Sequence, residues 1–265
     1  MSENSIKKVG TEVLKEGSKD IYYDGLKPAV KESGEALQAI VGLINNVLLY
    51  PIKKANIKYK CKLAEFEESF KLKIEKIPDD KLIEPPLNIA GPTLEALKYT
   101  FDTKELREMY MNLLASAMNY DTVKNTHPAY VDIIKSMSPL DAVVLKKIVL
   151  YHNNIPCARV LMAIDNNTYL DAMPKIFVPD IIDKEDPFLV SSSIQNLCRL
   201  GILTLVEEGI ESYNYNLIKK NDFVLKKYEK CKNEEKENEI QIMIKKQTIT
   251  INDFGRNFAE SCLYQ

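Results

Sequence analysis

The chain has two histidines, His127 and His152, whose side chains are the best suited to acid–base catalysis near neutral pH. His127 precedes Pro128 in a predicted loop, and His152 follows Tyr151 at a predicted helix end. Catalysis would require an imidazole within hydrogen-bonding reach of a nucleophile or an acid, and the sequence places no such neighbour beside either histidine. We therefore expect structural or surface roles for both.

The spacing of the remaining reactive residues matches no metal or nucleotide motif. The five cysteines are far apart, and the chain has no Cys-x-x-Cys, no His-Glu-x-x-His and no glycine-rich phosphate loop. Five acidic residues could in principle form a carboxylate site for magnesium, but their simpler role is in loops and helix caps. They are Asp79, Asp80, Asp183, Glu185 and Asp186. We predict no catalytic residue, no cofactor and no metal ion, and therefore a protein that is not an enzyme.

A helix predicted over residues 191–200 is the candidate for contact with DNA. Strands predicted after it would place this helix as the recognition helix of a winged-helix-like arrangement. Its candidate DNA contacts are Ser192, Gln195, Asn196 and Arg199. A DNA-binding helix needs several basic phosphate contacts, and only Arg199 is basic here. We therefore favour a protein-docking role and keep a DNA-binding regulator as the second alternative.

A mostly apolar helix predicted over residues 36–52 is the candidate for contact with lipid. A lysine-rich segment, 53–62, follows it, and an apolar helix with a basic flank can lie on an anionic bilayer surface. The candidate membrane-facing residues are Leu37, Ile40, Val41, Ile44 and Leu48. The segment is too short and polar to span a bilayer. The core of a helical bundle is its simplest role, and a membrane-perturbing effector is the first alternative.

The elements that position these residues fall into three predicted segments. Residues 1–20 form a flexible arm, 21–135 a helical domain and 136–265 a winged-helix-like domain. In the helical domain, apolar side chains recur at helical spacing. The helices predicted there are 26–50, 52–77, 92–100 and 104–120.

The second domain mixes helix and strand signals. Ser138 and Pro139 predict the start of a helix, and Gly201 predicts the end of another. The predicted helices are 142–151, 156–164, 191–200 and 254–264, the last capped by Asn252 and Asp253. The predicted strands are 202–206, 213–217 and 240–251. A charge-dense tract, 226–239, is either an exposed helix or a disordered insertion. We predict a mainly α fold with a small β component, in which an N-terminal helical bundle precedes a winged-helix-like α+β domain.

Composition narrows the class of protein and its partners. Apolar residues make up 45% of the chain and charged residues 28%, which is typical of a globular protein. The net charge of −2 provides no basic field for nucleic acid. The first 20 residues lack the apolar core of a secretory signal, and the scattered cysteines suit free thiols. We expect a cytoplasmic protein.

Residues 84–119 are the most informative stretch. Pro85 and Pro86 form a rigid start, Gly91 and Pro92 predict a tight turn, and two helical patterns follow. The segments Glu84–Pro92, Leu106–Met109 and Asn112–Met118, with His127-Pro128 and the tail Ile249–Phe258, together resemble the abortive-infection alpha family. Members of that family are bacterial proteins linked to phage defence.

The resemblance implies a role in phage defence in which infected cells are lost before phage spread. It brings no established catalytic residue, so the motif positions are candidate interaction or structural residues: Glu84, Pro85, Pro86, Gly91, Arg107, Glu108, Asn112 and His127. We predict an ion pair between Glu84 and Arg107 across the bundle. The favoured partner is a phage or host protein. A homo-oligomer and the inner-membrane surface are further options, and nucleic acid is disfavoured.

Overall fold

The computed structural model describes Gly42 and residues 57–151, 154–165, 167–179, 185–235 and 239–264. The candidate membrane-facing residues and His152 lie outside the described residues. The chain divides into two compact units, which we treat separately. The first unit takes in Met1–Lys135 and Glu260–Gln265, and the second takes in Ser136–Ala259.

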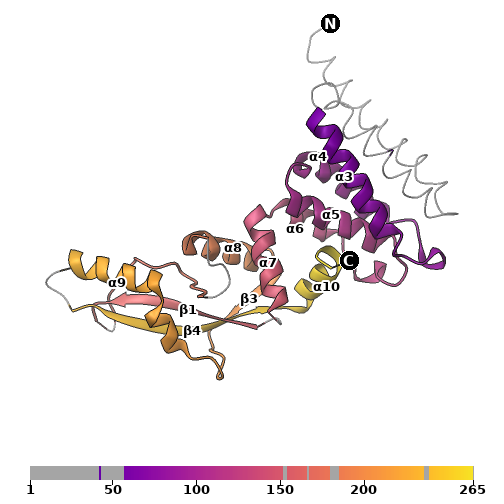
Figure 1. Ribbon diagram of the computed structural model, residues 1–265. Coiled ribbons are helices and arrows are strands. Elements are labelled where there is room, and N and C mark those ends of the chain that lie inside the picture. The colour runs from indigo at the N-terminus through magenta and orange to yellow at the C-terminus, as the bar shows by residue number, and fades with distance from the viewer. Residues whose placement is uncertain are drawn as a thin grey trace, which may run out of the picture. The chain divides into compact units, whose positions relative to one another are not determined.

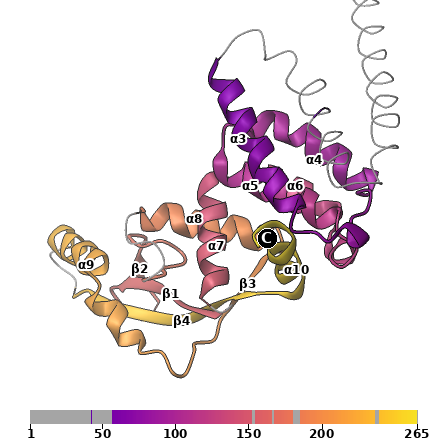
Figure 2. The same cartoon turned by 45° about the vertical axis from the view of Figure 1, so that its right-hand side comes forward.

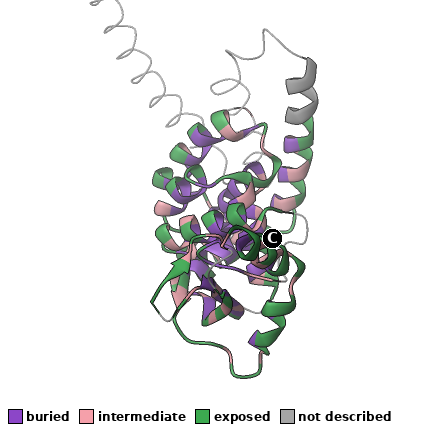
Figure 3. Cartoon of the chain, turned by 90° about the vertical axis from the view of Figure 1, so that its left-hand side faces the viewer, coloured by how far each residue is buried: buried purple, intermediate pink, exposed green. Residues whose placement is uncertain are grey.

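The first unit is built from helices (Figure 1). They are α3 (Ile57–Ile74), η2 (Asp79–Lys81), α4 (Leu87–Thr100), α5 (Lys104–Ala117), η3 (Val123–Asn125) and α6 (Ala129–Lys135), η marking a 3-10 helix. Apolar side chains at helical spacing turn inward. The Phe66 ring stacks on Phe70 with centroids 5.8 Å apart and tilts against Phe101 at 5.7 Å. Figure 3 shows buried residues on the inner sides of these helices and exposed residues on their outer sides.

The predicted tight turn at Gly91 and Pro92 is wrong, because α4 continues through both residues. A proline in a helix removes one N–H···O=C bond, which here would have gone to Asn88 near the helix start. A residue before proline normally avoids the helical conformation because its Cβ meets the proline ring, and Gly91 has no Cβ. Burial of Ile89, Leu94 and other side chains on one face then stabilises a continuous helix.

The second unit combines helices with one small sheet (Figure 1). Its elements are α7 (Pro139–Leu150), β1 (Asn154–Ala163), β2 (Tyr169–Leu170), α8 (Pro187–Arg199), β3 (Leu203–Val206), η4 (Tyr215–Lys220), α9 (Asp222–Glu234), β4 (Gln241–Ile251) and α10 (Asp253–Cys262), whose last residues belong to the first unit. The predicted start of α7 is confirmed, since Ser138 and Asp141 form a capping box and Pro139 follows the cap. The predicted end of α8 is also confirmed, since Gly201 has a φ of 76°.

The described strands form a four-stranded antiparallel sheet in the order β2-β1-β4-β3. β1 pairs with β4 along its whole length, from Asn154 opposite Thr250 to Ala163 opposite Gln241. β3 pairs only with residues 248–251 of β4, beside the end that leads into α10 (Figure 2). A mainly helical chain with a small antiparallel sheet confirms the predicted fold class.

Two predicted elements of this unit are wrong. Residues 156–164 were predicted as a helix but lie mostly in β1, because pairing with β4 outweighs local helix propensity. Residues 213–217 were predicted as a strand, but η4 begins at Tyr215, where the Asn214 side chain accepts a hydrogen bond from the Asn216 N–H. The first part of the charge-dense tract lies in helix α9, whose charged side chains face solvent while Val224 and Cys231 are buried.

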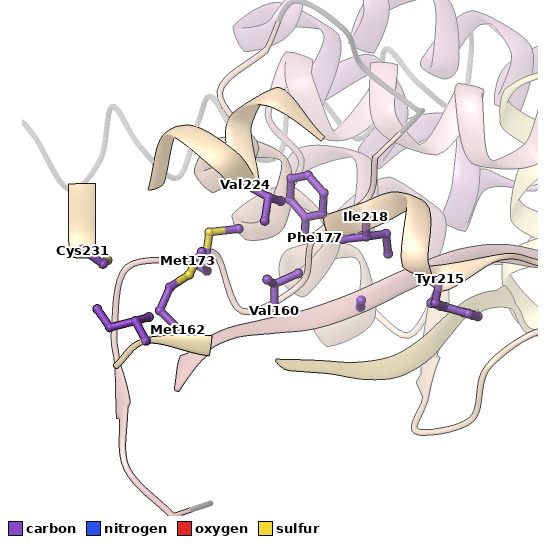
Figure 4. Packing of buried hydrophobic residues seen from close by; sticks show 10 residues of the cluster. Val160, Met162, Met173, Phe177, Tyr215, Ile218, Val224 and Cys231 are labelled. Atoms are coloured by element: carbon purple, nitrogen blue, oxygen red, sulfur yellow. The ribbon is translucent and has the colours of Figure 1, made fainter. Parts of the chain in front are cut away.

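One face of the sheet carries a hydrophobic core cluster of the second unit (Figure 4). Alternate residues of β1 point to this face because strand side chains alternate between faces. The buried residues of this cluster are Ala158, Val160, Met162, Met173, Phe177, Tyr215, Ile218, Val224, Cys231 and Ile240. The elements α7, β1, α8, β3 and β4 follow one another along the chain. That these elements form a winged-helix-like arrangement stays a prediction.

Candidate interaction site

Arg107 stabilises the end of α4 from inside the first unit. It is 8% exposed, and its Nη1 donates a hydrogen bond of 2.8 Å to the Phe101 carbonyl, at the C-cap of α4. Its guanidinium also lies 5.5 Å from the centroid of the Phe101 ring. A cation at a helix C-terminus is favourable because the last carbonyls lack helical partners. The predicted ion pair with Glu84 is absent from the described structure, and Glu84 is exposed.

Asn112 and Ser116 hold the end of α10. The Asn112 side-chain amide donates to the Cys262 carbonyl at 2.8 Å, and the Ser116 hydroxyl donates to the Ser261 carbonyl at 3.0 Å. The Ser261 hydroxyl in turn donates to the Asn125 carbonyl at 3.3 Å. We call Asn112, Ser116 and the two α10 carbonyls the C-terminal clasp. The clasp joins the end of α10 to the first unit, with which residues Glu260–Gln265 group.

The other motif residues shape the backbone of the first unit. His127 Nδ1 accepts a hydrogen bond of 3.1 Å from the Ala129 N–H at the start of α6, and its ring lies 5.9 Å from that of Tyr130. Pro85 is buried, and Pro86 is the N-cap residue of α4. Glu108 makes a solvent-exposed pair with Lys104 at 4.0 Å. The structure therefore brings these residues into separate local contacts and not into one pocket.

The candidate DNA-contact residues on α8 are mostly bonded to one another or to the unit itself. The Asn196 amide donates to the Asp141 carboxylate at 2.9 Å and to the Ser136 carbonyl at 3.2 Å. Arg199 donates to the Asn196 side-chain oxygen at 2.8 and 3.1 Å. Gln195 donates back to the Ser191 carbonyl at 3.2 Å, and Ser192 is exposed. Asn196 thus links α8 to the start of α7, a role that its sequence position could not indicate.

The outer part of β4, residues 241–246, presents a surface that sequence reasoning did not single out. Gln241, Met243, Lys245 and Lys246 are exposed, while Ile242 and Ile244 pack against the core shown in Figure 4. β3 does not extend along these residues. The strand prediction over 240–251 located them, but only the pairing register shows which part of β4 has a neighbour on each side.

A family model described as abortive infection alpha matches residues 58–262. The chain belongs to this family. The match confirms the resemblance drawn from the motifs and also covers residues 206–246, where the motifs had shown no resemblance. No curated protein and no solved structure matches the chain.

The described residues show neither a metal cluster nor a membrane span. No three histidine, cysteine, aspartate or glutamate side chains in the described part of the chain come together as metal ligands. Within the same residues, no helix is both long and apolar enough to cross a bilayer.

Several buried hydroxyls and thiols of this family member ionise only at high pH. Burial raises the pKa of Tyr130 to about 12 and the pKa of Tyr110 well above its usual range, with Cys262 as a further contributor to both. Burial also raises the pKa of the Cys157 thiol to about 12 and that of the Cys262 thiol well above its usual value. All these groups are neutral at physiological pH.

Alkaline pH is therefore expected to destabilise the protein. A group whose pKa is higher in the folded state keeps its proton while the unfolded chain loses it, so stability is full below pH ~9 and falls as pH rises toward ~12, by about 1.4 kcal/mol per pH unit for each such group. Urea unfolding at about pH 8 and about pH 10.5 measures this fall. Tyr110→Phe should lose about 1 kcal/mol at the lower pH, because its bond to the Val131 carbonyl is removed, but should show a smaller fall at the higher pH. Equal falls in both proteins would contradict the prediction.

Proposed function

We propose that this member of the abortive infection alpha family acts in phage defence by binding a phage or host protein in the cytoplasm, without catalysing a reaction. One observation carries the proposal. The polar motif side chains make hydrogen bonds that hold their own unit together: Arg107 to the end of α4, Asn112 to the end of α10, and His127 to the start of α6.

A catalytic group must be free to exchange a proton or electrons with a substrate, and in general it is placed beside a second reactive group. Arg107 and Asn112 are buried donors directed at backbone carbonyls. Such bonds order helices, and an ordered helical scaffold supports recognition by its surface. The motif therefore favours a binding protein whose partner contacts lie outside the motif.

Phage plating combined with assays of purified protein tests this proposal. Phage are expected to form fewer plaques on cells that carry the gene, and infected cells are expected to die before phage release. The purified full-length chain is expected to leave nucleic acid, NAD and nucleotides unchanged. Cross-linking in infected cells should yield a covalent adduct with one phage or host protein that is absent from uninfected cells.

A matched variant distinguishes a loss of partner binding from a loss of folded protein. Glu108→Ala changes a half-buried motif residue whose side chain reaches solvent, and this variant is expected to retain full defence. Variants of the C-terminal clasp should lose defence in proportion to their loss of folded protein. An activity that consumes nucleic acid or nucleotide and that stays with the wild-type chain through purification would overturn the proposal in favour of an enzyme.

A further inference from the structure

The backbone of β4 has an open edge whose direction follows from the register. Ala158 exchanges two hydrogen bonds of 2.9 Å with Phe177, so its N–H and C=O point away from β4. Lys246 lies directly opposite Ala158 in the antiparallel pair, so its own N–H and C=O point away from β1. Backbone directions alternate along a strand, so Ile242 and Ile244 share this orientation.

No described strand occupies the space that these groups face. β3 ends at Val206, which lies opposite Thr248. The segment that follows β3 passes against Lys246, since a Cβ on Gly209 would lie 2.9 Å from the Lys246 Cβ. The open part of the edge is therefore at Ile242 and Ile244, whose N–H and C=O groups have no hydrogen-bond partner among the described residues. Strand edges of this kind are sites at which an extended peptide can add a strand.

Two of the side chains along residues 241–246, those of Lys245 and Lys246, are positively charged. Lys245 lies directly opposite Arg159 on β1, and like charges at opposed positions destabilise a sheet. Arg159 donates to the Tyr169 hydroxyl at 2.9 Å, and Lys246 lies 5.6 Å from the centroid of the Tyr215 ring. The ion pairs of the described chain involve none of these three cations. A carboxylate placed beside Lys245 would offset its repulsion with Arg159.

We propose that the open edge of β4 binds an extended segment of a partner protein in which acidic and apolar residues alternate. The side chains of an added strand would alternate between the two faces of the sheet. One set would lie beside Met243 and Lys245, where acidic residues fit. The other set would lie beside Ile242 and Ile244, at the margin of the core, where apolar residues fit. This inference rests on the proposed role as a binding protein and names the chemistry of its partner.

A peptide-binding experiment on the full-length chain tests the inference. The probe is a fluorescein-labelled peptide of about nine residues, alternating valine and glutamate, long enough to pair with the open edge. Lys245→Glu is expected to weaken binding by about tenfold or more, because an attraction becomes a repulsion. Lys146→Glu, an exposed charge reversal on α7, is the matched control and should bind like the wild type. Hydrogen exchange of residues 241–246 should slow when the peptide binds.

A second variant tests the backbone contribution. Ile244→Pro removes one edge N–H and leaves the β1·β4 bonds in place, so it should abolish peptide binding if circular dichroism shows a folded protein. Lys245→Glu keeps the inference testable if the proline variant does not fold.

Equal affinity for a valine–lysine peptide, or no binding by the wild type, would overturn the inference. A wild-type dimer that Ile244→Pro converts to a monomer would overturn it as well, because a second copy would then occupy the edge. These readouts do not depend on phage plating, so the two proposals can fail separately.

Discussion

Gly255→Ala is expected to destabilise the second unit by about 3 kcal/mol or more, because the new methyl group has no room. A Cβ at this position would lie 2.2 Å from the Ile202 carbonyl oxygen and 2.9 Å from the Ile251 Cγ1. The backbone cannot easily move, since the Gly255 N–H donates to the Asn252 side chain at 2.8 Å and the Asn252 amide donates to the Gly201 carbonyl at 2.9 Å. Urea unfolding followed by circular dichroism measures the loss.

Gly201→Ala is the matched control for this variant. Gly201 has a φ of 76°, but a Cβ there would contact nothing within 4 Å. Its replacement should therefore cost only about 1–2 kcal/mol, the conformational penalty of a left-handed residue. If Gly255→Ala costs no more than Gly201→Ala, the close contact with Ile202 does not control the fold. Gly255, in the segment Ile249–Phe258 that resembles the family, is thus explained by its close contact with Ile202 and not by a turn.

Removal of the C-terminal clasp is the second change with a large expected effect. The double variant Asn112→Ala, Ser116→Ala should lose about 2–5 kcal/mol, because two buried carbonyl oxygens of α10 would lose their donors. Both residues are buried, at 5% and 1% exposure, so water would not readily replace the lost hydrogen bonds. Thermal and urea unfolding of the two single variants and the double variant give the loss and the coupling between the two positions.

Glu108→Ala is the control on the same helix. The Lys104 Nζ lies 4.0 Å from the Glu108 carboxylate, and the Lys104 side chain is solvent-exposed. The loss of this pair should therefore lower the free energy of unfolding by less than about 0.5 kcal/mol. A clasp variant as stable as this control would show that the end of α10 does not need these donors. A clasp variant that folds normally but fails in phage defence would instead assign Asn112 or Ser116 a direct role in partner contact.

The sequence by itself determined the features that depend on local chemistry. Ser138 with Pro139 marked the start of α7, Gly201 marked the end of α8, and Asn252 marked the start of α10. Each signal works because the residue satisfies or frees backbone groups within a few positions of itself. The motifs likewise predicted the family, which the family model then confirmed.

Tertiary structure decided the features that depend on residues far away in the chain. Residues 156–163 became a strand because β4, more than 75 residues later, supplied hydrogen bonds along its length. Asn112 was recognised as a motif residue, but its partner Cys262 is 150 positions away. The open edge of β4 could not be predicted either, since an edge exists only where a neighbouring strand ends. Local propensity governs short-range backbone bonding, whereas pairing register and buried polar contacts depend on which segments meet after the chain has folded.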